Sequence, residues 1–118
     1  DHGVAPNSAT YASLAVPYAR RGDVEKVETL MRESRSAGNT WQEREYLCLL
    51  SAYANAVPRQ AQKAERVFRQ LVAAGLAPSD HLLRYFRQAL GSKRASNVAK
   101  ELGVRMPRAS GGDRQRAE

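Results

Sequence analysis

Arginine and lysine residues gather in the second half of the chain, where they could hold phosphate groups. Residues 59–100 contain nine Lys and Arg against two acidic residues, whereas residues 1–58 contain six basic and seven acidic residues. Such a surface can follow a phosphate backbone with salt-dependent, sequence-independent affinity. The alternative is that side chains such as Lys63, Arg66 and Arg69 form only the solvated face of an amphipathic helix. The favoured phosphate contacts are Arg20, Arg84, Arg87, Lys93 and Arg94.

Residue types that support catalysis or metal binding form no recognisable pattern. Cys48 is the lone cysteine, and only His2 and His81 are available to pair with it. Neither a metal site nor a Cys–His nucleophile is therefore supported. Glu43 and Glu45 lie two residues apart, so on a helix their side chains diverge. We expect a non-catalytic protein with no metal or cofactor.

The composition bounds the class of protein. The 118 residues are 42% hydrophobic, enough for one folded domain, and the net charge of +7 with a pI near 10.1 favours a polyanionic partner. The lone cysteine suits a reducing compartment. No apolar run approaches the roughly 18 residues that a membrane-spanning helix needs. The first residues look like the end of a repeat, which predicts a fragment of a longer array.

The chain repeats itself with a period of about 35 residues, which predicts stacked supersecondary units. A closing signal of Gly, an apolar residue, Ala, Pro and a polar residue occurs at residues 3–7 and again at residues 75–79. An apolar stripe with helical spacing also recurs. Its members are Tyr11, Leu14, Ala15 and Tyr18, which return as Tyr46, Leu49, Leu50 and Tyr53.

The same spacing predicts six helices. The first runs from a cap at Asn7 or Ser8 to about Arg21, and Pro17 should kink it or break its last turn. The second follows Gly22 and the cap Asp23. The third opens with a capping box from Thr40 to Glu43. The fourth starts near Pro58, the fifth is capped by Ser79, and a short sixth by Ser92.

The predicted core follows the apolar faces of these helices. The second unit matches the first with two extra residues in its inter-helix turn, around residues 56–59. Whether Trp41, between the units, is buried or contacts a partner stays open. Beyond the first stripe and its repeat, the core residues are Val24, Val27, Leu30, Met31, Ala61, Ala64, Val67, Phe68, Leu71, Leu83, Phe86, Leu90, Val98 and Leu102.

These motifs resemble the pentatricopeptide repeat family. The tetratricopeptide pattern fits less well, because its early Trp and Leu-Gly are absent. The first unit carries the resemblance in Thr10-Tyr11, Leu14, Tyr18-Ala19-Arg20, Gly22-Asp23, Glu25, Leu30-Met31 and Gly38. The second unit keeps Tyr46, Leu49, Tyr53-Ala54, Ala64, Phe68 and Gly75.

The resemblance implies an all-α fold, an α-solenoid of about two and a half stacked antiparallel helix pairs. Residues 1–7 end a preceding repeat, 8–42 and 43–79 are two repeats, 80–103 is a degenerate terminal repeat, and 104–118 is a disordered basic tail.

The resemblance also implies a concave face on which each unit binds one base of single-stranded RNA. Applied to this chain, the resemblance makes Ala12 and Gln42 the residues that read the base of the first unit. Leu47 and Ser79 are the corresponding residues of the second unit. Because Ala12 and Leu47 cannot hydrogen-bond a base, we expect weak sequence readout. The other base-facing residues are Asn7, Ala9, Arg44, His81 and Arg84.

Two functional hypotheses remain. The first is a non-catalytic RNA-binding module of an organellar (mitochondrial or chloroplast) RNA-processing, stabilising or translation factor. The second is a protein-interaction scaffold within a larger organellar assembly, such as a ribosome or a polymerase-like complex. The basic residues favour RNA, whereas the unusual reader positions favour the scaffold. Both could hold if the assembly contains RNA.

Overall fold

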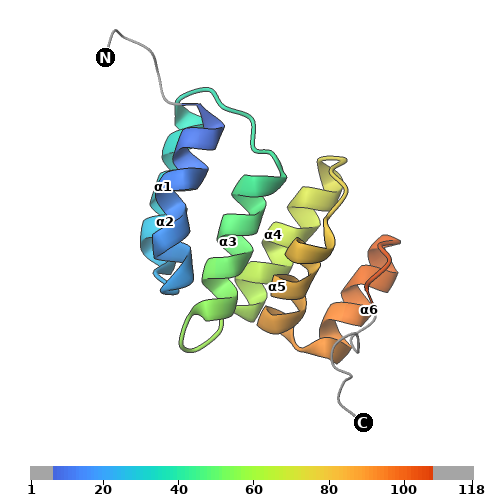
Figure 1. Ribbon diagram of the computed structural model, residues 1–118. Helices are drawn as coiled ribbons and strands as arrows, with labels where there is room; N and C mark the ends of the chain where they lie inside the picture. Colours follow the sequence, from blue (N-terminus) through green and yellow to red (C-terminus); the bar gives the residue numbers. More distant parts are fainter. Residues whose placement is uncertain (1–6, 108–118) are drawn as a thin grey trace, which may run out of the picture.

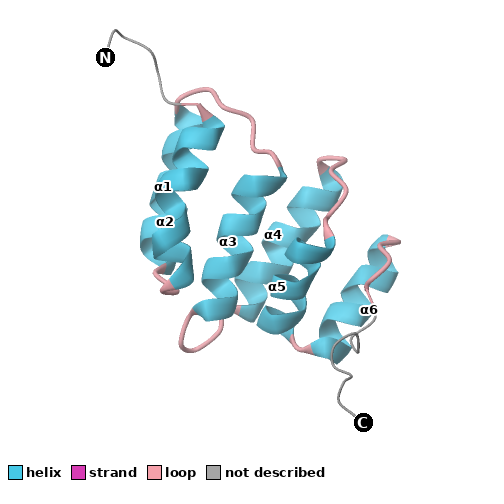
Figure 2. Ribbon diagram, viewed as in Figure 1, coloured by secondary structure: helices cyan, strands magenta, loops and turns pink. Residues whose placement is uncertain are grey.

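The computed structural model describes residues 7–107, which form α-helices and no β-strand (Figure 1). Loops alone connect the helices (Figure 2). None of the helices in this range is long and apolar enough to cross a membrane. Residues 1–6 and 108–118, which include most of the predicted leading segment and basic tail, lie outside the described residues. The helices are α1 (Ser8–Arg20), α2 (Val24–Ser36), α3 (Glu43–Asn55), α4 (Ala61–Ala73), α5 (Asp80–Leu90) and α6 (Ser92–Leu102).

The helices repeat along the chain at the offsets of the sequence pattern. α1 and α3 each have 13 residues and begin 35 residues apart, at Ser8 and Glu43. α2 and α4 also have 13 residues each but begin 37 residues apart, at Val24 and Ala61. The difference arises because the α3–α4 connection is two residues longer than the α1–α2 turn. Loops tolerate such insertions far better than packed helix faces do.

The helices form two layers. The odd-numbered helices lie side by side, since α3 packs against both α1 and α5, and each also packs against the helix that follows it in the chain. In Figure 1, α2 and α4 lie behind this row. α2 does not pack closely against α4, and α4 contacts α6 only weakly. The layer of odd-numbered helices is therefore closely packed, whereas the even-numbered helices stand apart.

Most of the predicted core is buried. Phe68 and Phe86 are fully buried, with stacked rings whose centroids lie 3.8 Å apart. Each such side chain contributes about 2–3 kcal/mol by leaving water. Other predicted core residues are only half-buried, namely Tyr11, Tyr18, Val24, Leu30, Ala61, Leu90 and Leu102. The predicted residues that are buried include Ala15, Val27, Met31, Tyr46, Leu49, Leu50, Tyr53, Ala64, Val67, Leu71, Leu83 and Val98.

The prediction that Leu14 lies in the core was wrong, because its side chain is 52% exposed. Leu49 occupies the equivalent position 35 residues later and is 2% exposed. α3 has α1 and α2 on one side and α4 and α5 on the other, so Leu49 is covered. Among the described residues α1 has neighbours on one side only. The same apolar position is thus core in α3 and surface in α1.

The start of α3 also differs from the predicted capping box of Thr40 and Glu43. The helix begins at Glu43, and the backbone N–H of Gln42 donates to the Glu45 carboxylate at 2.7 Å. The reason lies in Trp41, whose indole N–H donates to the Met31 carbonyl at 3.1 Å. This bond holds the chain extended against α2, so that the helix starts only after Trp41. Trp41 is half-buried between the two units.

The remaining helix ends follow the sequence with two exceptions. Asp23 and Ser79 accept hydrogen bonds from the backbone N–H groups of Lys26 and Leu82, as predicted caps should. α1, however, continues through Pro17 to Arg20, so its last turn is not broken. Ser92 is the first residue of α6, and Gly91 occupies the cap position.

Gly22 lies against the backbone at the end of α3. Its φ of 72° lies in the left-handed region, and a Cβ built there would come within 2.5 Å of the Asn55 carbonyl oxygen. Nearby, the Asn55 side-chain amide donates to the carbonyl oxygen of Ala19 at 3.0 Å. A glycine at this position lets the ends of α1 and α3 approach.

We expect Gly22→Ala to lower the free energy of unfolding by about 3 kcal/mol or more, because left-handed strain and overpacking add. Gly38→Ala is the matched control. Its φ is 94°, but a Cβ there meets nothing within 4 Å, so only about 1 kcal/mol of strain is expected. Urea denaturation followed by circular dichroism measures both values. Equal losses in the two variants would show that the contact with Asn55 is unimportant.

Candidate functional site

A cavity of about 250 Å³ opens on the face of the odd-numbered helices. It brings together Arg20, Leu47 and His81, three of the site residues predicted from the sequence, from three different helices. The residues that line it are Val16, Ala19, Arg20, Leu47, Cys48, Ser51, His81 and Tyr85.

Each helix contributes two side chains four residues apart to this cavity. Val16 and Arg20 come from α1, Leu47 and Ser51 from α3, and His81 and Tyr85 from α5. Residues with this spacing lie on the same helix face, one turn apart. The fourth-residue neighbours Val16, Ser51 and Tyr85 were missed as site residues, although this spacing from Arg20, Leu47 and His81 is the signal that could have found them.

Small residues allow α1 and α3, two of the three helices that line the cavity, to approach each other closely. Ala12, Ala15 and Ala19 on α1 are almost fully buried, and α1 packs closely against α3. The Cys48 thiol donates to the Ala12 carbonyl oxygen at 3.6 Å. Ala12, which was predicted to face a base, therefore has little exposed side-chain surface to offer one. Ala12 is 5% exposed, and its side chain is part of the helix contact.

The cavity combines a cation, a ring edge and an apolar floor. The Arg20 side chain is exposed at the end of α1. The rings of His81 and Tyr85 meet edge to face, with centroids 5.2 Å apart. Cys48, on the floor, is 6% exposed, and burial together with the charge of Glu45 raises the pKa of its thiol to about 11. Near pH 7 the Cys48 thiol is therefore protonated and neutral. Because only the thiolate is nucleophilic, Cys48 acts here as a packing group.

The other predicted base-facing residues fall into two groups. Asn7 and Ser79 use their side-chain oxygens as helix caps, which accept from the backbone N–H groups of Thr10 at 2.9 Å and Leu82 at 3.1 Å. The Ser79 backbone N–H also donates to Glu43 at 2.8 Å. In the second group Ala9 is half-buried, whereas Gln42, Arg44 and Arg84 are exposed, and Gln42 is the N-cap residue of α3.

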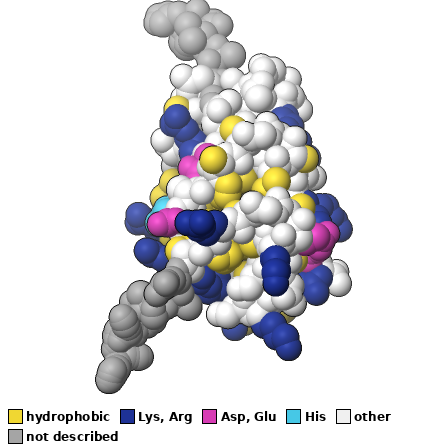
Figure 3. Space-filling model, turned by 90° about the vertical axis from the view of Figure 1, so that its right-hand side faces the viewer, with side chains coloured by type: hydrophobic (Ala, Val, Ile, Leu, Met, Phe, Trp, Pro, Cys, Tyr) yellow, Lys and Arg dark blue, Asp and Glu magenta, His cyan; other side chains and the backbone are white. Residues whose placement is uncertain are grey.

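The predicted phosphate contacts beyond Arg20 differ in their surroundings. Arg87 is half-buried and donates to the backbone carbonyl of Pro107. Arg94 is engaged by an acidic residue, Glu65. Lys93 is exposed and has no ion pair among the described residues. At this end of the molecule, Lys and Arg side chains lie around a central area of hydrophobic side chains (Figure 3).

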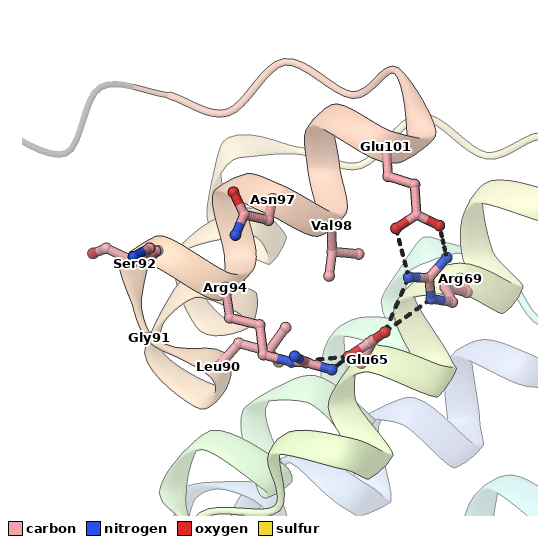
Figure 4. Close-up of a pocket in the computed structure, with 10 residues that line it drawn as sticks. Glu65, Arg69, Leu90, Gly91, Ser92, Arg94, Asn97, Val98 and Glu101 are labelled. Carbon is pink, nitrogen blue, oxygen red and sulfur yellow. Dashed lines mark hydrogen bonds and ion pairs between the residues drawn. The ribbon is translucent and has the colours of Figure 1, made fainter.

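A second cavity, of about 570 Å³, lies between α4 and α6 and is crossed by a chain of ion pairs (Figure 4). Glu65 accepts from Arg94 at 3.0 Å and from Arg69 at 3.0 Å, and Arg69 also binds Glu101 at 3.0 and 3.1 Å. Burial raises the pKa of the Glu65 carboxyl, but the bonds from Arg94 and Arg69 outweigh it, so the pKa is lowered. This network links two helices that barely touch.

These observations define the class of protein. The described part is an all-helical, repeat-like protein with a mostly apolar cavity, lined by one arginine, on the layer of odd-numbered helices. Within residues 7–107 no group of three or more His, Cys, Asp or Glu is placed to hold a metal ion. Comparison with protein-family models, with curated proteins and with solved structures gives no match for this chain.

Alkylation of Cys48 by iodoacetamide at pH 8 should be at least about tenfold slower in the folded protein than in concentrated urea. The raised pKa leaves little thiolate, and the thiol is buried. The folded-state rate should climb only as the pH approaches 11. Mass spectrometry of quenched samples measures it. Equal rates in both conditions would mean that Cys48 is accessible and ordinary.

Glu65→Gln should lower the free energy of unfolding by about 1 kcal/mol at pH 7, as expected for a small ion-pair network. The pKa of Glu65 is lower in the folded state than its ordinary value of 4.5, so the ionised carboxylate stabilises the fold at pH values above 4.5. This stabilisation is lost as the pH falls through the folded-state pKa. The difference from wild type should therefore shrink below about pH 4.5. Thermal melts from pH 3 to 7 test this. Glu33→Gln, exposed and outside the ion pairs, serves as the control and should change little at any pH.

Proposed function

We propose that this chain is a non-catalytic module that binds single-stranded RNA on the face of its odd-numbered helices, with weak sequence readout. In this proposal the helix pairs are units of an α-solenoid of pentatricopeptide-repeat type. The RNA runs across α1, α3 and α5, and the module belongs to an organellar RNA-processing, stabilising or translation factor. The family and the organelle rest on the sequence resemblance alone.

The observation that carries the proposal is the cavity shared by Arg20, Leu47 and His81. Its volume of about 250 Å³ suits part of a nucleotide, and it offers an apolar wall beside an exposed guanidinium. Proteins that bind single strands without sequence preference combine positive charge along the backbone with rings or apolar surface for the bases. Arg44 and Arg84, exposed on α3 and α5, supply further positive charge.

The weak readout follows from the residues that would face the bases. Leu47 cannot hydrogen-bond a base edge, and Ala12 is buried between helices. Discrimination by a good polar pair is worth about 1–3 kcal/mol per base, and this module lacks such pairs in its two best repeats. Affinity would then come mainly from phosphate contacts.

A protein scaffold is the second candidate, and Leu14 is the observation that favours it. Leu14 is an exposed leucine, and it leaves apolar surface on α1 that another protein could cover. Single exposed apolar residues are common on monomers. The exposed leucine therefore supports a scaffold less strongly than the shared cavity supports RNA binding.

The proposal predicts micromolar binding of fluorescent oligouridine and oligoadenine, similar for both and weakening steeply with salt. Arg20→Gln combined with Arg84→Gln should weaken binding about tenfold at low salt and make the salt dependence shallower, because two phosphate contacts are lost. Fluorescence anisotropy over a salt series measures both effects. Neither arginine has a partner among the described residues, so folding should be unaffected.

The matched control is Arg32→Gln combined with Arg66→Gln, which removes the same charge from the even-numbered helices. It should change RNA affinity by less than about threefold. No binding at low salt by the wild-type chain would refute the RNA proposal and leave the scaffold. Strong preference for one RNA would contradict the weak readout.

A further inference from the structure

A separate groove lies on the other layer of the molecule, between α2 and α4. It measures about 380 Å³. It exists because α2 and α4 do not pack closely against each other, so that Leu49 and Tyr53 of α3 form part of its lining between them. None of the residues that line this groove belongs to the cavity on the odd-numbered helices.

Basic residues line both walls of the groove. Arg32 and Arg35 come from α2, and Lys63 and Arg66 come from α4. In each pair the residues are three apart, so they share a helix face. The groove therefore presents two facing rows of positive charge.

The acidic side chain in the lining of the groove is already engaged. Glu28 binds Lys63 at 3.3 Å and accepts a hydrogen bond from the Tyr53 hydroxyl at 2.8 Å. Arg32 donates to Thr29, a neutral group, and Arg66 has no hydrogen bond or ion pair among the described residues. The charges of Lys63 and Glu28 cancel, which leaves Arg32, Arg35 and Arg66 without a counter-charge among the residues that line the groove.

The aromatic rings of the groove are also engaged. The Arg35 guanidinium lies 3.6 Å from the centroid of the Trp41 ring, and the Trp41 and Tyr46 rings form a T-shaped pair with centroids 5.3 Å apart. Tyr53 is 3% exposed. Binding of single-stranded RNA relies on aromatic faces on which bases stack. The groove offers positive charge but leaves no open pair of ring faces for a base.

We propose that the groove between α2 and α4 binds an acidic peptide segment of a partner protein. Carboxylates of Asp and Glu side chains are acceptors without donors and pair with arginine, often through two parallel hydrogen bonds. Arg32 and Arg66, on opposite walls, clamp the segment from both sides. The carboxylates carry the recognition, because the apolar lining residues Val67 and Leu49 are already buried.

The test uses the full 118-residue chain and a ten-residue peptide of alternating Glu and Leu, with a Gln–Leu peptide of the same length as the uncharged probe. Trp41, the single tryptophan, lies in the groove and reports binding through its own fluorescence. We expect saturable binding of the acidic peptide and at least tenfold weaker binding of the uncharged one. Arg32→Gln combined with Arg66→Gln should weaken the acidic peptide by at least tenfold.

Arg20→Gln combined with Arg84→Gln is the charge-matched control and should change peptide affinity by less than about threefold. An equal loss in both double variants would overturn the proposal, because it would show attraction to net charge alone. Oligouridine added in place of the peptide should leave the Trp41 fluorescence unchanged. If oligouridine shifts it and the Arg32/Arg66 variant abolishes that shift, the groove binds RNA and the peptide assignment is wrong. Circular dichroism confirms that each variant keeps its helices.

Discussion

Helix α3 is enclosed by its neighbours, and the rest of the described chain depends on that enclosure. From Glu45 to Ala54 every residue except Leu47 is buried. α1, α2, α4 and α5 all pack against this one helix. The enclosure requires small residues where α1 meets α3, and a glycine at residue 22 where the chain turns against Asn55. It also buries a carboxylate, since Glu45 is fully buried, with one oxygen bonded to the Gln42 backbone and the other unpaired.

The two layers solve the packing problem in different ways. α1 presents buried alanines where it packs against α3, whereas the even-numbered helices are joined by ion pairs that recur in register. Glu28 of α2 pairs with Lys63 of α4, and Glu65 of α4 pairs with Arg94 of α6. In both cases the fifth residue of one helix binds the third residue of the next even-numbered helix. Exposed pairs contribute little each, so they set the spacing of the layer more than its stability.

The positions of the helices could be predicted from the sequence. Their apolar residues recur at helical spacing, and Pro, Gly and capping residues lie between the helices. The offsets of 35 and 37 residues reappear in the helix starts. The sequence pattern could not show which neighbouring helices cover each apolar helix face. Leu14 and Leu49 are equivalent in sequence, and only the neighbours of α3 distinguish a core residue from a surface one. The same limit applies to Ala12, whose burial depends on how closely α1 and α3 approach.

Three of the predicted site residues meet in one cavity. Leu47 and His81 were predicted from the family resemblance, and Arg20 from its place at the end of the first helix. Whether a cation is available depends on contacts between helices that are distant in sequence. Arg94 looked equivalent to Arg20 as a phosphate contact, yet Glu65, 29 residues earlier, neutralises it.

The enclosure of α3 also bears on how the two proposed binding surfaces relate. Leu47 and Ser51 line the cavity of the odd-numbered layer, and Leu49 and Tyr53 line the groove of the even-numbered layer. Both surfaces are thus built on opposite faces of one close-packed helix. Close-packed interiors have low compressibility, so α3 should act as a rigid spacer. An RNA strand on one face and an acidic partner on the other would then be held at a fixed distance, and these two anionic ligands would not compete for one site.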